Sequence, residues 1–556
     1  MSKIRMITKD DLEKQGVETS ACRIADELAA KIAGLLKIEV SQISTARSLI
    51  SLGLDSISVM ILKQIIEDDF GCSVEIAVLF SSPVAEIAKV IVDQIRGEEL
   101  ESQRKIDWSA LIPEAEVSSE VFPLTDLQSA YWMGRNQGFE VGGVAAHVYM
   151  EVNVTEEDLD QQGLNQAWQK LIERHPMLRA VITKDGQQKV LTDIPQYKIF
   201  YHDMTELSED IQCIHSKLSH QVLDLDAWPL FEIHHLKISQ THSILLISID
   251  LLITDIWSID LLFKEWYQLY RKPEMVLAKP KIYFRDFCAA SKALTTTDLY
   301  KTSMDYWKQR IPTLPLAPQL PMEKSPKKLK KVEFHNRSQI IPMDWWSNLK
   351  ERAATYGITP SIVLMAAFAK ILSLWSRNPR FSLNLTLFNR LPIHSDINQI
   401  VGDFTSVLVF EVDNTGPLCF AEFAIRLQKQ LAKDMEYRYY SGVDVIRDLA
   451  REWDKTPQEA VLPVVFTSTL SADGPMVFQS KNKIFGKTSI ISQTPQVFLD
   501  HQVYENDEHL VLNWDSVDEL FPANMLDDMF DAYQKLLKEL ALNPAIWERE
   551  IREMLP

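Results

Sequence analysis

The sequence predicts a small all-helical domain followed by a much larger α/β region. In the first hundred residues, apolar side chains recur three or four positions apart, which is the spacing of one helix face. From Phe122 onward, helical patterns alternate with short strand-like runs, as in α/β or α+β proteins. The length of 556 residues agrees with this division, because it is too long for a single hydrophobic core.

Composition argues against two classes of partner. With 46% apolar and 24% charged residues, the chain has the make-up of an ordinary globular protein. Its formal net charge of −19 disfavours nucleic-acid binding, which needs a basic face, and docking to an anionic membrane. The dense basic cluster between Lys327 and Lys331 is interpreted as a solvated loop. We therefore expect neither nucleic acid nor membrane as a partner.

The cysteine and histidine patterns predict a cytoplasmic protein without a metal site. The five cysteines are scattered singly, which fits reduced thiols better than disulfides or a zinc site. The twelve histidines form no H-E-x-x-H motif. Residues 1–20 lack the apolar core of a secretory signal. The longest apolar stretch, 361–375, is shorter than a membrane span and contains Lys370.

Three patterns define the helices of the first domain. An amphipathic first helix is predicted by the apolar residues Ile24, Leu28, Ile32 and Leu35. After a polar loop, Asp55 is placed to cap a second helix that contains Ile57, Ile61 and Ile65. Pro83 begins a last helix with the inward-facing residues Val84, Ile87, Ile91 and Ile95. The result is a small helix bundle of about eighty residues.

Ser56 directly follows this capping aspartate. A residue at a helix N-terminus lies beside free backbone N–H groups and the positive end of the helix dipole, which favour an attached phosphate. The alternative is a serine that only caps the helix, which is common at this position.

Residues 97–120 are dominated by charge and serine without a sustained period, which predicts a connector. Trp108 and Leu111 are expected to pin it against a neighbouring domain. In the large region we expect helices over 166–174 and 361–375, strands over 178–182 and 243–249, and a crossover over 312–331. The absence of GxGxxG and GxxxxGK[ST] argues against dinucleotide or ATP chemistry.

Two short apolar runs near the C-terminus each contain one reactive group. PVVFTS at 463–468 contains Thr467, and QTPQVFLDHQ at 493–502 contains Asp500. Their apolar neighbours predict buried strand edges. A carboxyl in such surroundings has a raised pKa and suits proton transfer near neutral pH. Taken alone, Asp500 is better interpreted as an ordinary hydrogen-bonded residue at a strand end.

The segment Leu-Gly-Leu-Asp-Ser-Ile at 52–57 resembles the attachment motif of acyl, peptidyl and aryl carrier proteins. In that family the serine, here Ser56, bears a 4′-phosphopantetheine arm whose thiol holds the substrate as a thioester. The Leu-Asp pair before the serine is most similar to the aryl carriers that start siderophore assembly.

The remainder resembles the heterocyclization (Cy) domains of nonribosomal peptide synthetases. Seven motifs follow the family's order: FPLTDLQSAYWMGR at 122–135, RHPMLRAVI at 174–182, DLLITDIWS at 250–258, NLTLFNR at 384–390, GDFTSVLVF at 402–410, PVVFTS and QTPQVFLDHQ. The whole chain, with its carrier, is similar to the N-terminal part of yersiniabactin-type and pyochelin-type siderophore synthetases.

The motif at 250–258 separates this branch from amide-forming condensation domains, which have His-His-x-x-x-Asp-Gly there. Asp250 and Leu251 stand in place of the two histidines, and Asp255 keeps the aspartate. The pattern Asp-x-x-x-x-Asp-x-x-Ser, which ends at Ser258, defines the heterocyclization branch. The His234-His235 pair lies in a different sequence context and does not substitute. We favour a structural role for Asp250 and Asp255.

The resemblance implies the fold and the division of the chain. Residues 20–97 form a four-helix-bundle carrier domain, 98–120 a linker, and 121–556 a two-lobed α/β condensation-type domain built like a chloramphenicol-acetyltransferase pseudodimer. Its N-lobe covers about 121–311 and its C-lobe about 312–556.

It also implies the reaction and its participants. An acyl group on the phosphopantetheine of Ser56 is condensed with Cys, Ser or Thr on a downstream carrier, and the amide is cyclodehydrated to a thiazoline or oxazoline. Separate adenylation enzymes and a phosphopantetheinyl transferase are expected as partners. The identity of the acyl group and of the acceptor amino acid stays open.

By the same match, Asp500 is the general acid/base and Thr467 its hydroxyl partner. The motifs add Gln493, Gln496 and Arg390 as supporting residues. For Asn384, Thr386 and Arg390, lining a tunnel between the lobes and a core-strand role remain equal alternatives, whereas Tyr131 and Arg135 are expected to be structural. The alternative functions are an amide-only condensation domain and a non-catalytic docking platform for carriers.

Overall fold

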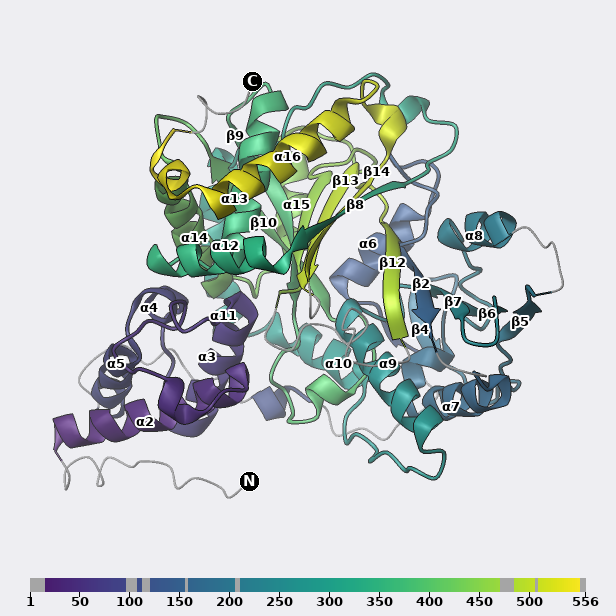
Figure 1. The fold of residues 1–556 in the computed structure, drawn as a ribbon, viewed down its shortest axis with the longest axis horizontal. Coiled ribbons are helices and arrows are strands. Elements are labelled where there is room, and N and C mark those ends of the chain that lie inside the picture. The colour runs from purple at the N-terminus through teal and green to yellow at the C-terminus, as the bar shows by residue number, and fades with distance from the viewer. Residues whose placement is uncertain are drawn as a thin grey trace.

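The computed structural model describes residues 16–96, 108–112, 121–155, 159–205, 211–470, 485–505 and 509–550. Figure 1 shows a small helical domain at the N-terminal end, beside a larger domain that consists of two lobes with a sheet in each.

The helical domain contains α2 (Val17–Leu36), α3 (Ser56–Phe70), α4 (Ile76–Ser81) and α5 (Val84–Arg96), with the short η1 (Val40–Gln42). The expected four-helix bundle is thus confirmed. Its core is formed by buried aliphatic side chains of all four helices. In α3 the inward face carries Val59, Leu62 and Ile66, while Ile61 and Ile65 are only half-buried.

The N-lobe is built on a five-stranded sheet of order β12-β2-β7-β6-β5. These strands are β12 (Phe485–Gln493), β2 (His147–Val154), β7 (Ser243–Asp250), β6 (Phe231–Lys237) and β5 (Phe200–Asp203). A small sheet of β1 (Phe122–Pro123), β4 (Gln187–Val190) and β3 (Ala180–Ile182) lies beside it. The lobe's helices are α7 (Gln161–Arg174), α8 (Ile211–Ser219), α9 (Ile256–Arg271) and α10 (Phe284–Leu294).

The C-lobe is built on a six-stranded sheet of order β10-β9-β11-β13-β14-β8. Its strands are β8 (His335–Pro342), β9 (Arg380–Phe388), β10 (Thr405–Asp413), β11 (Val464–Ser468), β13 (Leu499–Glu505) and β14 (His509–Ser516). The helices are α12 (Met343–Thr355), α13 (Pro360–Trp375), α14 (Phe420–Glu436), α15 (Gly442–Glu452) and α16 (Met525–Leu542). Two further helices, α6 (Asp126–Gly134) and α11 (Asp298–Arg310), precede this lobe in sequence.

The two lobes exchange chain segments. Strand β12 belongs to the C-terminal part of the sequence, but it pairs antiparallel with β2 in the N-lobe sheet. After Gln493 the chain crosses back and enters the C-lobe sheet as β13. Leu391, Ile400 and Phe404 also pack in the N-lobe core. The expected boundary near residue 311 therefore does not separate the lobes completely.

The expected elements of the large domain are largely present. The helix over 166–174 lies within α7, the strand over 243–249 within β7, and the helix over 361–375 within α13. The strand expected over 178–182 is shorter, because Pro176 begins a 3-10 turn (Pro176–Arg179) and only Ala180–Ile182 is extended. The crossover over 312–331 contains two short 3-10 turns and no strand.

In the described ranges, no single helix is long and apolar enough to cross a membrane. Helices α12 and α13 meet the length and composition criteria only as a pair, and they are bent by 99° at the break between them. Eleven of the sixteen residues of α13 are buried, and its apolar side chains pack in the C-lobe core.

The helical domain packs against the C-lobe, below α14 in the view of Figure 1. Ala432 and Met435 of α14 join its hydrophobic core, and Glu436 accepts a hydrogen bond from the backbone N–H of Ile76 at the start of α4. In the connector, the ring centroids of Trp108 and Tyr439 are 6.0 Å apart. Trp108 and Leu111 pack on the N-lobe core. The other residues of the 98–120 connector, apart from 108–112, lie outside the described ranges.

Candidate active site

The candidate site is one polar face of the C-lobe sheet. Because successive side chains of a strand point to opposite faces, alternate residues of neighbouring strands gather on one side. On this side lie Asn336 and Ser338 of β8, Asn384 and Thr386 of β9, Thr467 of β11, Asp500 and Gln502 of β13, and Asn513 and Asp515 of β14. We call this set the polar face.

The polar face is directed toward the N-lobe, and the opposite face is core. On the same side of the sheet, Tyr504 and Val511 pack in the N-lobe core. On the other side, Phe466, His501 and Trp514 alternate with the polar residues and pack on Phe368 of α13. Burial lowers the pKa of His501 to about 3, so this histidine of the QTPQVFLDHQ motif is a neutral core residue.

Strand register brings the two predicted reactive residues together. Val465 of β11 is opposite Asp500 of β13, and Thr467 is opposite Gln502 in the same parallel pair. Asp500 and Thr467 are therefore diagonal neighbours on one face, two positions apart along adjacent strands.

Asp500 is buried, and its two oxygens differ in their surroundings. Oδ2 accepts a hydrogen bond of 2.8 Å from Nε2 of Gln502. Oδ1 is enclosed and has no hydrogen-bond partner among the described residues. Burial raises the pKa of Asp500 to about 6, with Gln502 and Thr467 acting in the opposite direction. A carboxyl with this pKa and one free oxygen can accept and return a proton near neutral pH.

Thr467 forms its shortest side-chain contact with Thr386, at 2.7 Å between the two hydroxyl oxygens. Toward Asp500 it supplies a weaker polar interaction that lowers the pKa of that carboxyl. The pair of hydroxyls thus fixes Thr467 beside Asp500 and connects β11 to β9.

Three amide side chains at the site also have unpartnered atoms. Both polar atoms of the Gln493 side chain, Oδ1 of Asn384 and Oδ1 of Asn513 are buried without a hydrogen-bond partner among the described residues. Gln493 ends β12, opposite His147 in the N-lobe sheet. Buried amides normally have partners, so these groups are suited to hold a polar substrate between the lobes.

Sequence reasoning missed a second buried carboxyl, Asp515. Asn336 Nδ2 donates to it at 2.8 Å, the Ser492 backbone N–H at 3.0 Å, and Gln502 Nε2 at 3.1 Å. Burial, with a contribution from Asp500, raises the pKa of Asp515 to about 8. The alternation of polar residues in β14, Asn513 and Asp515 within an apolar run, was the available pattern in the sequence.

Tyr131 was expected to be structural, but it lies in the electric field of the site. Loss of solvent raises the pKa of its phenol well above the usual value, and the carboxylates of Asp403, Asp500 and Asp255 add to this shift. Asp403, which sequence reasoning also missed, is buried with one oxygen unpartnered among the described residues. The phenol of Tyr131 is therefore close enough to Asp500 and to the Asp255 and Asp403 acids to interact with the charge of each.

Asp250 is part of a structural contact at the end of β7. Its carboxylate pairs with Arg135, which follows α6, and accepts a hydrogen bond of 3.0 Å from the Leu252 backbone N–H. Arg135 also donates to the Leu223 carbonyl at 2.8 Å. The position of the first histidine in the amide-forming pattern is thus occupied by an acid in an ion pair with Arg135, whose Nε has no hydrogen-bond partner among the described residues.

Asp255, Ser258 and Arg390 form a second structural contact. Asp255 caps α9 by accepting a hydrogen bond of 2.7 Å from the Ser258 backbone N–H, and it also accepts from the Phe404 backbone N–H at 3.2 Å. Arg390 donates to Asp255 at 3.2 Å and to the Ser258 hydroxyl at 2.9 Å. These residues fasten the 389–404 segment to the N-lobe rather than facing Asp500.

Gln496 lies at the edge of the site. It has a positive φ of 61°, and its side chain donates to the Gln458 carbonyl at 3.3 Å. It thus shapes the crossing between β12 and β13. The His234-His235 pair lies within β6, where His235 bonds to Gln161 and Ser243. Across the described part of the chain, no group of three or more His, Cys, Asp or Glu side chains is arranged to hold a metal ion.

The first turn of α3 suits the predicted phosphopantetheine arm. Asp55 caps this 15-residue helix by accepting a hydrogen bond of 2.8 Å from the Ser58 backbone N–H, and its other oxygen is buried without a partner among the described residues. Ser56 is the first residue of the helix, where backbone N–H groups lack intrahelical partners. The local backbone therefore fits a phosphate at this position.

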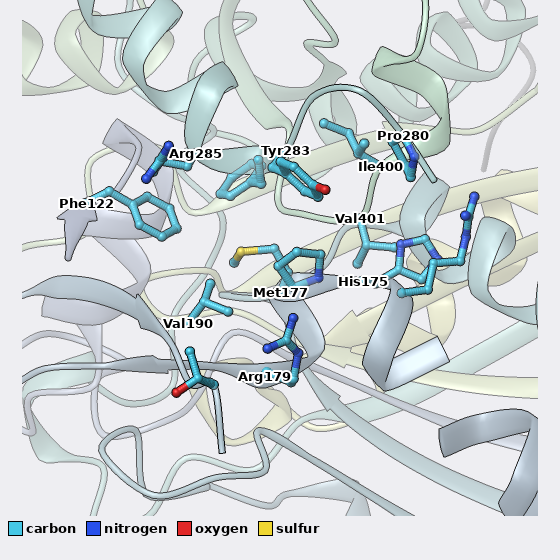
Figure 2. Close-up of a pocket in the computed structure, with 14 residues that line it drawn as sticks. Phe122, His175, Met177, Arg179, Val190, Pro280, Tyr283, Arg285, Ile400 and Val401 are labelled. Atoms are coloured by element: carbon cyan, nitrogen blue, oxygen red, sulfur yellow. The ribbon is translucent and has the colours of Figure 1, made fainter. Parts of the chain in front are cut away.

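A separate pocket of about 90 Å³ lies in the N-lobe (Figure 2) and contains no residue of the polar face. Its basic side chains already have partners. Arg174 donates to Glu265 at 2.9 Å, and Arg179 donates to the Leu191 carbonyl at 2.7 Å. We therefore place the chemistry at the polar face.

Comparison with known families and proteins agrees with this arrangement. The family model described as "Condensation domain" matches residues 118–555, and the model described as "Phosphopantetheine attachment site" matches residues 26–90. The chain is 33% identical over 445 residues to pyochelin synthetase PchF of Pseudomonas aeruginosa, which covers 79% of this chain and 24% of that protein.

It is also 32% identical over 552 residues to phenyloxazoline synthase MbtB of Mycobacterium tuberculosis, covering 97% of this chain and 38% of that protein. Both relatives are therefore much longer than the matched region. Among solved structures, the EpoB cyclization-docking bidomain from Sorangium cellulosum matches with a TM-score of 0.69 and 34% identity, over 84% of this chain and 92% of that one.

Proposed function

The chain belongs to the condensation-domain family and has a phosphopantetheine attachment domain in front, and from this premise we propose that it is a carrier–heterocyclization didomain of a nonribosomal peptide synthetase. The observation that carries the proposal is Asp500, a buried carboxyl with a pKa raised to about 6, beside the Thr467 hydroxyl on the polar face.

The proposed reaction has two steps. First, the amine of a Cys, Ser or Thr acceptor attacks the carbonyl of the acyl thioester. An amide forms as the C–S bond breaks, and the thiol leaves with the proton that the amine gives up. Second, the side-chain thiol or hydroxyl of the acceptor bonds to that amide carbon. The carbonyl oxygen then departs as water with the hydrogens of the thiol or hydroxyl and of the amide nitrogen, which leaves a thiazoline or oxazoline.

The first step gains mainly from holding two substrates together between the lobes. The second requires a group that both accepts and donates a proton, and we assign this role to the free Oδ1 of Asp500. Thr467, held by Thr386, would orient the amide, because a hydroxyl of ordinary pKa is too weak an acid to act alone. Gln493 and Asn384 would bind the polar atoms of the substrate through their unpartnered groups.

The carrier domain bears covalent 4′-phosphopantetheine, and we propose Ser56 as its attachment site. When bound, this arm holds the acyl group as a thioester. We further propose that the loading adenylation enzymes are separate proteins, that the acceptor is on a downstream carrier, and that the protein works in the cytoplasm. The likeness to PchF and MbtB favours a siderophore-type product with an aryl acyl group.

Intact-mass analysis of a reconstituted reaction tests this function. The chain is converted to its pantetheinylated form, loaded with an aryl acid, and mixed with a downstream carrier that bears Cys or Thr. We expect a product on that carrier that is one water lighter than the aryl amide. Asp500→Asn is expected to retain amide formation and to lose ring closure by about a hundredfold or more.

Two other results would contradict the proposal. Accumulation of the amide without loss of water by the wild-type chain would assign it to amide-only condensation. No transfer to the downstream carrier at all would indicate a docking platform. Normal ring closure by Asp500→Asn would remove Asp500 from the mechanism, while ring formation by the wild type would keep the overall function.

A further inference from the structure

Asp500 and Asp515 form a buried carboxyl pair connected by a single amide group. Nε2 of Gln502 donates one hydrogen to Oδ2 of Asp500 at 2.8 Å and the other to Oδ2 of Asp515 at 3.1 Å. The two aspartates are opposite each other on adjacent antiparallel strands, β13 and β14. An amide NH₂ has two donors, so this bridge uses both of them and fixes the two carboxyls relative to each other.

Among the described residues, the groups that interact with this pair include no counter-ion. Asp515 interacts with Asn336 of β8, the Ser492 backbone of β12, Gln502 and Asp500, and its charge also raises the pKa of the Tyr504 phenol. Asp500 interacts with Gln502, Thr467 and the Tyr131 phenol of α6. None of these groups is a cation.

Arg337, which follows Asn336 in β8, forms its ion pairs with other acids. Arg337 of β8 binds Asp518 and Asp527 at 2.8 and 2.7 Å, on the other side of the strand.

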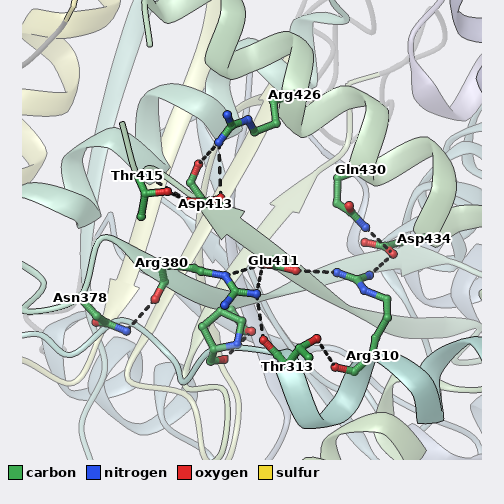
Figure 3. Close-up of polar contacts among 12 residues, drawn as sticks. Arg310, Thr313, Asn378, Arg380, Glu411, Asp413, Thr415, Arg426, Gln430 and Asp434 are labelled. Atoms are coloured by element: carbon green, nitrogen blue, oxygen red, sulfur yellow. Dashed lines mark hydrogen bonds and ion pairs between the residues drawn. The ribbon is translucent and has the colours of Figure 1, made fainter. Parts of the chain in front are cut away.

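Asp434 is a buried acid that does have a counter-ion, although burial raises its pKa to about 6 as well and Arg310 only opposes that shift. Asp434 of α14 pairs with Arg310 and accepts hydrogen bonds from Tyr306 at 2.7 Å and Gln430 at 2.9 Å (Figure 3). Ionised Asp434 therefore has a neighbouring positive charge. Two ionised carboxylates at the polar face have none, so full ionisation of the pair is costly and one proton is retained.

We propose that Asp515, acting through Gln502, is a positioning residue for ring closure: the Asp500–Gln502–Asp515 unit retains one proton at neutral pH and holds Asp500 where it can exchange a proton with the substrate. This inference rests on the proposed heterocyclization function. Asp515 itself does not touch the reacting atoms, because its oxygens are occupied by Asn336, Ser492 and Gln502.

The singly protonated pair is the form that suits cyclodehydration. Ring closure must take up a proton from the attacking thiol or hydroxyl and supply one to the departing oxygen. A pair without any proton cannot supply it, and a doubly protonated pair cannot take one up. The pKa values of about 6 for Asp500 and about 8 for Asp515 place the singly protonated form between these two limits.

The test is the pH dependence of ring closure, measured by intact mass on the full-length pantetheinylated chain between about pH 5 and pH 9. For the wild type we expect a bell-shaped profile with limbs near 6 and 8. For Asp515→Asn we expect the alkaline limb to move toward the lower value, so that at about pH 8 ring closure falls about tenfold or more while amide formation stays within about twofold.

A second variant shifts the profile the other way. Gln502 lowers the pKa of both carboxyls, so Gln502→Leu is expected to move both limbs to higher pH. Asp434→Asn is the matched control: it removes a buried acid distant from the polar face, and it is expected to lower the melting temperature without moving either limb.

Each result decides between the possibilities. Profiles of Asp515→Asn and Gln502→Leu that coincide with the wild type would overturn the inference, as would an equal loss of amide and ring at every pH, which indicates a purely structural role. Amide formation without ring closure by the wild type itself would instead overturn the proposed function, and this inference with it.

Discussion

At the scale of single residues, the unusual feature of this protein is that two acids are buried side by side, with no cation beside them in the part of the chain that the structure describes. Such groups make the stability of the fold depend on pH. The pKa values of Asp500 and Asp515 are about 6 and about 8 in the folded chain, against an ordinary value of 3.8. Between about pH 4 and pH 8 the folded state therefore binds more protons than the unfolded state. The free energy of unfolding falls as the pH rises through this range.

Replacing Asp515 by Asn should therefore help the fold more at alkaline than at acidic pH. We expect the stability of Asp515→Asn relative to the wild type to rise by at least about 1 kcal/mol between about pH 5 and pH 9. Urea unfolding of the full chain at several pH values measures this difference. Parallel curves for the two proteins would show that Asp515 has an ordinary pKa.

Asp518 provides a control of opposite sign. Its carboxylate binds Arg337 at 2.8 Å, and its pKa is below the ordinary value despite partial burial. It therefore stabilises the fold above the unfolded pKa, and this contribution is lost as pH falls. Asp518→Asn should be less stable than the wild type near neutral pH, with the difference closing under acidic conditions.

The sequence singled out two residues of the polar face, and the reason can be stated. Asp500 and Thr467 each lie in a short apolar run that matches a family motif, and both features can be recognised locally, although their roles stay a prediction. Asp515 is equally buried, but its importance depends on the β13–β14 register, which pairs it with Asp500. That register is a tertiary property, and neither motif nor periodicity specifies it.

At the scale of elements, α9 shows how the heterocyclization-type motif acts on the architecture. Its N-cap, Asp255, also binds Arg390 and the Phe404 backbone N–H, which belong to the segment before β10. The acid therefore starts a helix and fastens a distant loop. These contacts favour the structural interpretation of the DLLITDIWS motif, since its aspartates are engaged away from Asp500.

Asp255→Ala should cost more than the loss of a simple cap. Removing a cap typically costs about 1 kcal/mol, but here Arg390 would also be left as a buried, unpaired charge, so we expect a loss of about 3 kcal/mol or more. The control is Thr297→Ala at α11, where Thr297 caps by accepting from the Tyr300 backbone N–H at 3.3 Å, with an expected loss of about 1 kcal/mol. Thermal unfolding of both variants checks this; equal losses would refute the linked role of Asp255.

The element order was predictable, but the strand exchange was not. Helical and strand periodicities identified α7, β7 and α13 within a few residues, because those elements have one clear apolar face or a continuous apolar run. Nothing in the 485–493 sequence shows that β12 pairs with β2, more than three hundred residues earlier. Sequence order therefore assigned this segment to the wrong lobe.

At the scale of the whole molecule, the end of the helical domain that contains Asp55 lies near the C-lobe. Asp55, directly before Ser56, lies close enough to Glu505 for the two charges to interact, and Glu505 is the last residue of β13. Asp500 lies five positions earlier on the same strand, about 17 Å away at the usual rise of an extended chain. Strand β13 therefore has Asp500 of the polar face near its start and the residue that interacts with Asp55 at its end.

This arrangement predicts that the contact with α14 serves transfer from the chain's own carrier. Met435→Glu places a charge in the apolar contact between α14 and the carrier core, and Glu436 next to it already holds the start of α4. We expect acyl transfer from the Ser56 arm to fall about tenfold, with no loss when the same acyl group is supplied as a small free thioester. The second measurement separates docking from damage to the active site.

Arg426→Ala supplies the matched control on the same helix. Arg426 is exposed and pairs with Asp413 at 3.5 Å (Figure 3), and it is not one of the α14 residues that join the carrier core. It should leave both reactions unchanged. If Met435→Glu reduced both reactions equally, the effect would lie in the C-lobe core. If it reduced neither, the carrier would reach the polar face from a different position, and the α14 contact would be a resting arrangement rather than the one used for transfer.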